Sequence, residues 1–150
     1  MVRFNQYLEQ HKLQEWKFHY INYYQLKSYL KENLIDIFDR SLDIELSKVE
    51  NFYRSQIDSL ALKNSLEDQY QSADNLRQYV LLNIVGFIKI IKKRNKNLTD
   101  SSLETIDAKE KLSSYIFYHS RDLETQLKRI CDQADKENSQ LLQQHFESSN

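Results

Sequence analysis

Apolar residues recur at spacings of three and four through the first half of this chain, the period at which side chains share one face of an α-helix. The repeating positions are Phe38, Leu42, Leu46, Val49, Tyr53, Ile57 and Leu60. Their spacing predicts one long amphipathic helix, over about residues 34–63, with a single buried stripe.

A second apolar segment follows a polar stretch at residues 67–75, which we expect to contain a turn. This segment predicts a second long helix over about residues 76–96, packed antiparallel to the first. Its longest apolar run, residues 79–91, is interrupted by Asn83 and Lys89 and is shorter than the roughly 20 residues of a membrane span. We therefore expect a buried helix of a soluble protein and no transmembrane segment.

Weaker patterns precede the two long helices. Residues 3–11 predict a short helix and residues 13–20 a loop. Asn22 is the expected N-cap of a second helix, because its side chain can accept a hydrogen bond from an unpaired backbone amide of the first turn. These elements should form a small hairpin at the start of the chain.

The C-terminal third is less regular. A break at residues 97–102 precedes a weaker helical region. The residues expected on its buried side are Leu112, Ile116, Leu123, Leu127 and Ile130. From Asp132 onward the chain is polar and rich in glutamine. We therefore expect one helical domain over residues 1–132 and a polar extension, residues 133–150, that is helical or disordered.

The composition favours helices throughout. Gly occurs once and Pro not at all among the 150 residues, so the chain has few means of building tight strand turns. The predicted fold is all-α, with an N-terminal helical hairpin on two long antiparallel core helices and shorter C-terminal helices. A single glycine also excludes a Gly-rich phosphate loop, a dinucleotide-binding fingerprint and a nucleophile elbow.

Few residues offer catalytic or metal chemistry. The single cysteine, Cys131, excludes an internal disulfide, and its apolar neighbours predict a small core residue. The histidines contain no zinc-type pair, and we expect each of them at the surface or in a loop: His11, His19, His119 and His145. The carboxylates of residues 43–50 alternate with lysine and predict a solvated, weakly paired face. We expect no enzyme activity, no metal and no cofactor.

Positive charge is concentrated at the end of the second long helix, in the sequence GFIKIIKKRNK. Five of its last eight residues are basic, although the formal net charge of the chain is −1. At about 100° per residue, four lysines fall within one arc of about 100°. They are Lys89, Lys92, Lys93 and Lys96. The lysine face is about 10 Å long and suits a compact ligand that carries several phosphates.

Other residues of this stretch are expected to be structural. Gly86 permits close helix packing, and the apolar Phe87, Ile90 and Ile91 should face the core. Arg94 projects away from the lysine face, and we expect Arg94 and Lys92 to be little more than solvated charges. The helix macrodipole favours cations in the last turn, but it does not account for Lys89, two turns earlier.

Three segments, in this order, resemble the motifs of the SPX domain. They are WKFHYINYYQLK at residues 16–27, LDIELSKVENFY at residues 42–53 and GFIKIIKK at residues 86–93. The first contains Tyr-Ile-Asn-Tyr followed by Leu-Lys, the second Leu-Asp-x-Glu-Leu-x-Lys-Val and then Phe-Tyr, and the third matches Gly-Phe-x-Lys-Ile-x-Lys-Lys in full. The resemblance covers roughly residues 1–130.

This resemblance implies a domain that binds inositol polyphosphates, such as inositol hexakisphosphate, and inositol pyrophosphates. The residues that match the phosphate contacts of the family are Tyr23 and Lys27, Lys89 as an inner lysine, and Lys93 and Lys96 with Lys92 alongside. The family usually begins Met-Lys-Phe-Gly-Lys, whereas here Val2 precedes Arg3, Phe4, Asn5 and Gln6. We therefore expect one basic contribution near the ligand to be absent.

The expected function is a non-catalytic sensor that reports phosphate status to an attached effector domain or a separate protein partner. The resemblance implies a place on the cytoplasmic side, in the cytosol or nucleus or at the cytosolic face of a membrane through a partner. Two alternatives are a helical module whose lysines bind anionic membrane or nucleic acid, and a structural helical adaptor. Nucleic acid is not expected, because the basic cluster is confined to one short face.

Overall fold

The computed structural model describes residues 3–99 and 102–148, and all its regular elements are helical. In chain order they are α1 (Phe4–His11), a 3₁₀ turn (Gln14–Trp16), α2 (Tyr23–Lys31), α3 (Ile35–Leu60), α4 (Leu66–Lys96), α5 (Ala108–Ser113), α6 (Ile116–His119) and α7 (Arg121–Ser148). This arrangement confirms the predicted all-α fold. None of the helices in the described ranges is long and apolar enough to cross a membrane.

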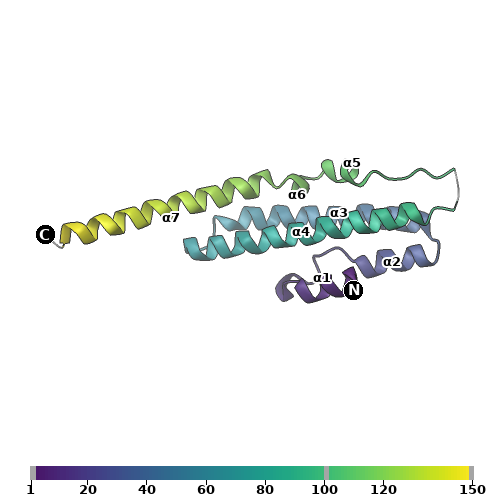
Figure 1. Cartoon of the computed structure of the whole chain (residues 1–150), viewed down its shortest axis with the longest axis horizontal. Coiled ribbons are helices and arrows are strands. Elements are labelled where there is room, and N and C mark those ends of the chain that lie inside the picture. Colours follow the sequence, from purple (N-terminus) through teal and green to yellow (C-terminus); the bar gives the residue numbers. More distant parts are fainter. Residues whose placement is uncertain (1–2, 100–101, 149–150) are drawn as a thin grey trace.

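Helices α3 and α4 form the antiparallel pair that the apolar spacing predicts, and they lie side by side along the molecule (Figure 1). Six residues of the predicted α3 stripe are buried, and Ile57 is half-buried. The predicted core residues of α4, Phe87, Ile90 and Ile91, are also buried. The periodicity of three and four therefore locates the core of the bundle correctly.

Helix α4 begins at Leu66, well before the predicted start near Leu76. Ser65 caps it by accepting a hydrogen bond from the backbone N–H of Asp68 at 3.1 Å. Acidic residues in the first turn favour a helix N-terminus because they face the positive end of the macrodipole. The polar stretch at residues 67–75 therefore belongs to nearly three additional helical turns, in which Ala73 is completely buried and the other residues are exposed or half-buried.

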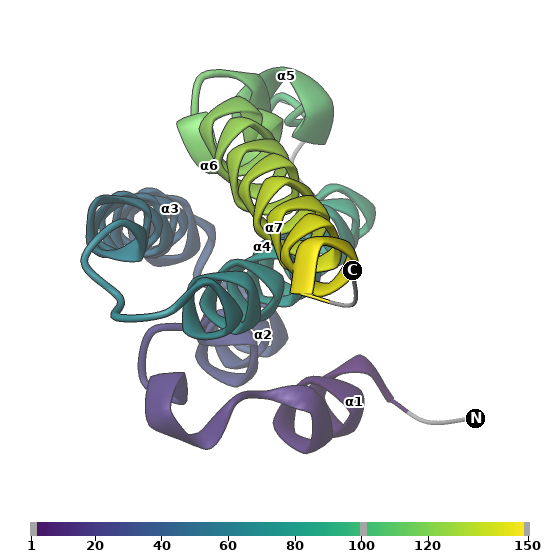
Figure 2. The same ribbon diagram turned by 90° about the vertical axis from the view of Figure 1, so that its left-hand side faces the viewer.

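The N-terminal hairpin covers one side of this pair. Viewed end-on, α1 and α2 lie on one side of α4, and α5, α6 and α7 lie on the other (Figure 2). Helix α2 contacts both α3 and α4. Its predicted cap is confirmed, since the side chain of Asn22 accepts a hydrogen bond from the backbone N–H of Gln25 at 3.2 Å.

The hairpin packs closely against α4 at Gly86. A Cβ atom added there would lie 3.0 Å from Cγ2 of Ile21 and 3.3 Å from the ring of Phe4. Such distances are shorter than ordinary van der Waals contact, so the side chains of Ile21 and Phe4 must shift to admit a larger side chain. The predicted role of this glycine in close packing is confirmed.

Replacing Gly86 by Leu should lower the free energy of unfolding by about 1–3 kcal/mol, because the added atoms overpack this contact. Urea denaturation followed by circular dichroism measures the change. Gln71→Leu, at an exposed position of the same helix, is the matched control and should stay within about 0.5 kcal/mol of wild type. Equal effects of the two substitutions would contradict the close-packing role.

The C-terminal helices are not all shorter than the core helices. Helix α7 has 28 residues and continues to Ser148, and its C-terminal part projects beyond the bundle (Figure 1). Leu123 and Ile130 are buried, but every residue from Cys131 to Ser148 is exposed. Cys131 is therefore a surface thiol, because it lies where α7 leaves the bundle, and the predicted core position is wrong.

The other residues predicted for the buried side of the C-terminal region differ in how deeply they are buried. Leu112 is buried and Leu127 is half-buried, whereas Ile116 is 40% exposed at the start of α6.

Glu50 on α3 fixes the start of α6, because its carboxylate accepts hydrogen bonds from the backbone N–H groups of Ile116 at 2.8 Å and Phe117 at 3.0 Å. Glu50 is thus a buried helix cap, not a member of a solvated face.

Arg94 is buried with 4% of its surface exposed, so the expectation of a solvated charge is wrong. It does project away from the lysine face, and its Nε and Nη2 atoms donate to the two carboxylate oxygens of Asp39 at 2.7 and 3.0 Å. Its Nη1 atom also donates to the backbone oxygen of Glu104 at 3.1 Å. Arg94 therefore fastens both α3 and the segment after α4 to the end of that helix.

Asp39→Ala should lower the free energy of unfolding by about 1.5–3 kcal/mol, because it leaves a buried guanidinium without its charged acceptor. The ion pair between Arg77 and Asp74 supplies a control, since the Arg77 side chain is 53% exposed. Asp74→Ala should cost less than about 1 kcal/mol in the same urea titration. A loss for Asp39→Ala no larger than that of the control would show that the Arg94 pair is dispensable.

Candidate functional site

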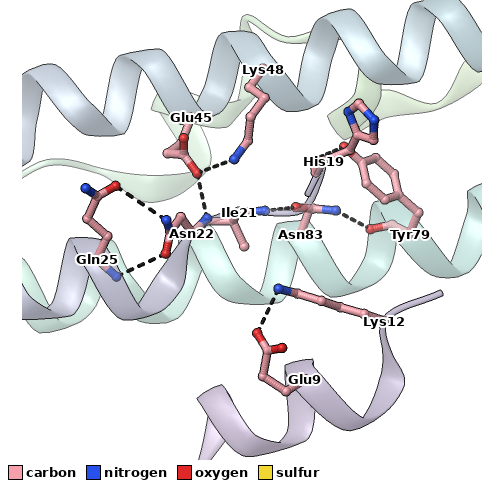
Figure 3. Close-up of polar contacts among 10 residues, drawn as sticks. All are labelled: Glu9, Lys12, His19, Ile21, Asn22, Gln25, Glu45, Lys48, Tyr79 and Asn83. Carbon is pink, nitrogen blue, oxygen red and sulfur yellow. Dashed lines mark hydrogen bonds and ion pairs between the residues drawn. The ribbon is translucent and has the colours of Figure 1, made fainter. Parts of the chain in front are cut away.

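The loop that precedes α2 is hydrogen-bonded to α4 through the buried side-chain amide of Asn83. The backbone N–H of Ile21 donates to Oδ1 of Asn83 at 2.7 Å, and Nδ2 of Asn83 donates to the backbone oxygen of Tyr79 at 2.7 Å (Figure 3). The hydroxyl of Tyr79 in turn donates to the backbone oxygen of His19 at 2.8 Å. Asn83 has no exposed surface, so both of its polar groups need these partners.

A carboxylate on α3 holds the first turn of α2. The backbone N–H of Asn22 donates to Oε1 of Glu45 at 2.6 Å, and Lys48 donates to the same oxygen at 2.8 Å (Figure 3). Glu45 is 9% exposed, so it is a buried positioning group and not part of a solvated face. With the Asn22 cap, this bond fixes where α2 starts and therefore where its side chains point.

Aromatic rings fill the space behind this loop. Trp16 packs edge-on against Phe52, with ring centroids 5.2 Å apart, and also against Tyr79 at 5.9 Å. His19 stacks on Phe52 at 4.1 Å. Residues 16–27 thus contact both other motif segments, residues 42–53 through Glu45 and Phe52, and residues 86–93 through Gly86.

All six candidate site residues line a single cleft of about 800 Å³ between α2, α4 and the start of α1. The lining residues are Arg3, Phe4, Asn5, Tyr23, Lys27, Lys31, Lys89, Lys92, Lys93 and Lys96. Tyr23 and Lys27 are one helical turn apart on α2 and therefore project from the same face. The four candidate lysines come from the last two turns of α4.

Seven of the lining residues are cations and none is acidic. Within residues 3–99 and 102–148, none of the seven has an ion-pair partner, in contrast to Lys12, Lys48 and Arg94. The charge of Lys93 lowers the pKa of the Lys27 ammonium below its ordinary value, with smaller contributions from burial, Lys31 and Arg3. The cleft is therefore a region of concentrated positive potential.

The candidate lysines differ in their surroundings. Lys27 and Lys93 are half-buried, whereas Lys89, Lys92 and Lys96 are exposed. The Nζ atom of Lys89 lies 5.9 Å from the centre of the Phe4 ring, within the range of a cation–π contact. Lys92 is solvated, as expected, but it also lines the cleft.

Tyr23 presents a hydroxyl group from a largely buried side chain. Its ring packs edge-on against Phe4, with centroids 4.9 Å apart, and only 7% of the residue is exposed. Burial raises the pKa of the phenol above its ordinary value, so the hydroxyl stays protonated near neutral pH. Tyr23 can therefore donate a hydrogen bond into the cleft.

Two cations in the cleft were not among the sequence candidates. Lys31 lies one turn beyond Lys27, a spacing that could have indicated it. Arg3, just before α1, supplies a further basic group to the cleft. The expected absence of one basic contribution near the ligand stays a prediction. The Arg3 side chain does not cap α1, and Phe4 and Asn5 in the first turn of that helix also line the cleft.

A scan against models of known protein families finds no match for this chain. In the part of the chain that the structure describes, no group of three or more His, Cys, Asp or Glu residues could hold a metal ion. The candidate site therefore rests on the geometry and charge of the cleft.

Lys93→Met should raise the pKa of Lys27, because it removes the largest electrostatic cause of the lowered value. NMR titration of the lysine side chains measures this pKa, with Lys109→Met on α5 as a control that should leave it unchanged. A lowered folded-state pKa means that the unfolded chain binds more protons. The unfavourable contribution of Lys27 to the free energy of folding is therefore lost as pH rises from its folded-state pKa towards its unfolded-state pKa. An unchanged pKa of Lys27 in the Lys93→Met variant would contradict the proximity of the two ammonium groups.

Proposed function

We propose that this protein is a non-catalytic sensor of inositol polyphosphates and inositol pyrophosphates. The observation that supports the proposal most directly is the set of seven cations, without carboxylate partners, around one cleft. They come from the residue before α1, from α2 and from α4, so they are not confined to one helix. This arrangement suits a compact ligand with phosphates on several sides better than an extended strand of nucleic acid.

The residue types suit such a ligand. Each lysine is a point charge on a flexible stem and can adapt to phosphates at different ring positions. Tyr23 adds a hydroxyl donor, and charge-assisted hydrogen bonds to phosphate are among the stronger polar interactions. Selectivity among inositol phosphates would then depend on the number and position of the phosphate groups.

Ligand binding would also change the stability of the N-terminal hairpin. Without a ligand, the cations of α2 and α4 repel each other, as the lowered pKa of Lys27 indicates. A bound polyanion replaces this repulsion by attraction and draws α1, α2 and α4 together. A partner or attached effector domain that contacts the hairpin would thereby receive the signal of phosphate status.

Lys27→Ala and Lys89→Ala should each weaken the binding of inositol hexakisphosphate by about tenfold or more, because each removes a charge-assisted contact. Isothermal titration calorimetry measures the affinity, and Lys109→Ala, an exposed lysine on α5, should bind as wild type does. Rising salt should weaken binding, since the interaction is largely electrostatic.

Inorganic phosphate and duplex DNA serve as competing ligands in the same titrations. The proposal predicts that a pyrophosphorylated inositol phosphate binds at least as well as the hexakisphosphate and far better than either competitor. Binding of DNA with equal affinity would favour a nucleic-acid module. Absence of binding to every inositol phosphate at moderate salt would leave a structural adaptor and refute the sensor.

A further inference from the structure

An apolar stripe leads along α4 into the basic cleft. Leu81, Val85 and Ile88 are 57%, 41% and 41% exposed, although they belong to the central helix of the bundle. Their spacing of four and three places them on one face of the helix. Lys92 and Lys96 continue the same face, with Lys89 at its edge, and the helix has no acidic residue from Leu81 to Lys96.

The stripe also borders a groove between α1 and α4. This groove has a volume of about 550 Å³, and the residues that line it include Phe4, Tyr7, Leu81, Val85 and Lys89. Phe4 and Lys89 line the basic cleft as well, so the two depressions share a wall. Tyr7 is 44% exposed at the rim of the groove, a position in which an aromatic side chain can enter a lipid–water interface.

We propose that this composite surface docks onto membranes that contain a polyphosphorylated inositol lipid. The headgroup occupies the basic cleft beside Lys89, and the glycerol region lies along the groove. Leu81, Val85 and Ile88 insert into the interface between headgroups and acyl chains. The inference rests on the proposed function, because the same cleft takes the inositol phosphate headgroup.

Charge complementarity selects this partner. A helix face that combines exposed apolar residues with adjacent cations binds anionic bilayers, through buried apolar area and electrostatic attraction together. The lysine cluster alone would be enough to hold a soluble inositol phosphate. The exposed apolar stripe beside it is the feature that indicates a membrane. The juxtaposition gives soluble and lipid-borne headgroups one shared site, so the soluble ligand competes with the membrane and releases the protein.

Vesicle co-sedimentation tests the inference, with the soluble ligand measured separately by calorimetry. Three vesicle types are compared: phosphatidylcholine alone, phosphatidylcholine with phosphatidylserine at matched charge, and phosphatidylcholine with phosphatidylinositol bisphosphate. The full chain should sediment with the third type about tenfold more strongly than with the first. Inositol hexakisphosphate should displace it from these vesicles.

The triple substitution Leu81→Gln, Val85→Gln and Ile88→Gln separates the lipid site from the soluble one. It should reduce vesicle binding about tenfold or more and change the affinity for inositol hexakisphosphate by less than about twofold. The double substitution Leu141→Gln and Leu142→Gln, on the exposed end of α7, is the matched control and should change neither. Circular dichroism verifies that each variant folds.

The outcomes distinguish the two claims. Vesicle binding by the triple variant equal to that of wild type would overturn the membrane inference, as would equal binding of wild type to all three vesicle types. If wild type binds inositol hexakisphosphate in solution but no vesicle, the membrane inference fails and the sensor proposal stands. If it binds neither the soluble ligand nor the headgroup, both fail.

Discussion

The position of the N-terminal hairpin on α4 depends on the buried amide of Asn83. This side chain accepts a hydrogen bond from the backbone of Ile21 and donates one to the backbone of Tyr79. Both bonds are required, because a buried amide without partners costs free energy. Gly86, one turn further along the same helix, leaves room for Ile21 to pack against the helix backbone. Together they fix the loop that precedes α2, and with it the direction in which α2 presents Tyr23 and Lys27.

The cleft concentrates charge at a cost to the folded state. Cations on adjacent turns and adjacent helices repel one another, and the lowered pKa of Lys27 is a direct consequence. The apolar contacts beneath them oppose this repulsion, since Leu26, Phe87 and Ile90 are almost completely buried. The bundle therefore brings together cations that have no acidic partner within the described residues and that its own stability does not require. Under the proposed function, a polyanion would supply the missing negative charge, whether it is free in solution or attached to a lipid.

Periodicity located the core of this protein but not the ends of its elements. The stripe on α3 and the buried side of α4 were predictable because every third or fourth residue is apolar. The start of α4 at Leu66 was not, since a polar segment can form either a turn or the exposed face of a helix, and the Ser65 cap decides between them. Cys131 was misplaced for a related reason. Its neighbour Ile130 is buried, but every residue of α7 from Cys131 to Ser148 is exposed.

The composition and the apolar spacing were enough to predict a helical chain, and the spacing of Lys89, Lys93 and Lys96 was enough to predict that they share a helix face. The resemblance added Tyr23 and Lys27, which lie more than 60 residues away in the sequence from the lysines of α4. Which cations line the cleft and which are paired within the protein depends on how the helices pack. Arg94 is buried against Asp39, whereas Arg3 and Lys31 join the cleft. A local pattern specifies the face of a helix, but the partner of a charge depends on which other helix packs against that face.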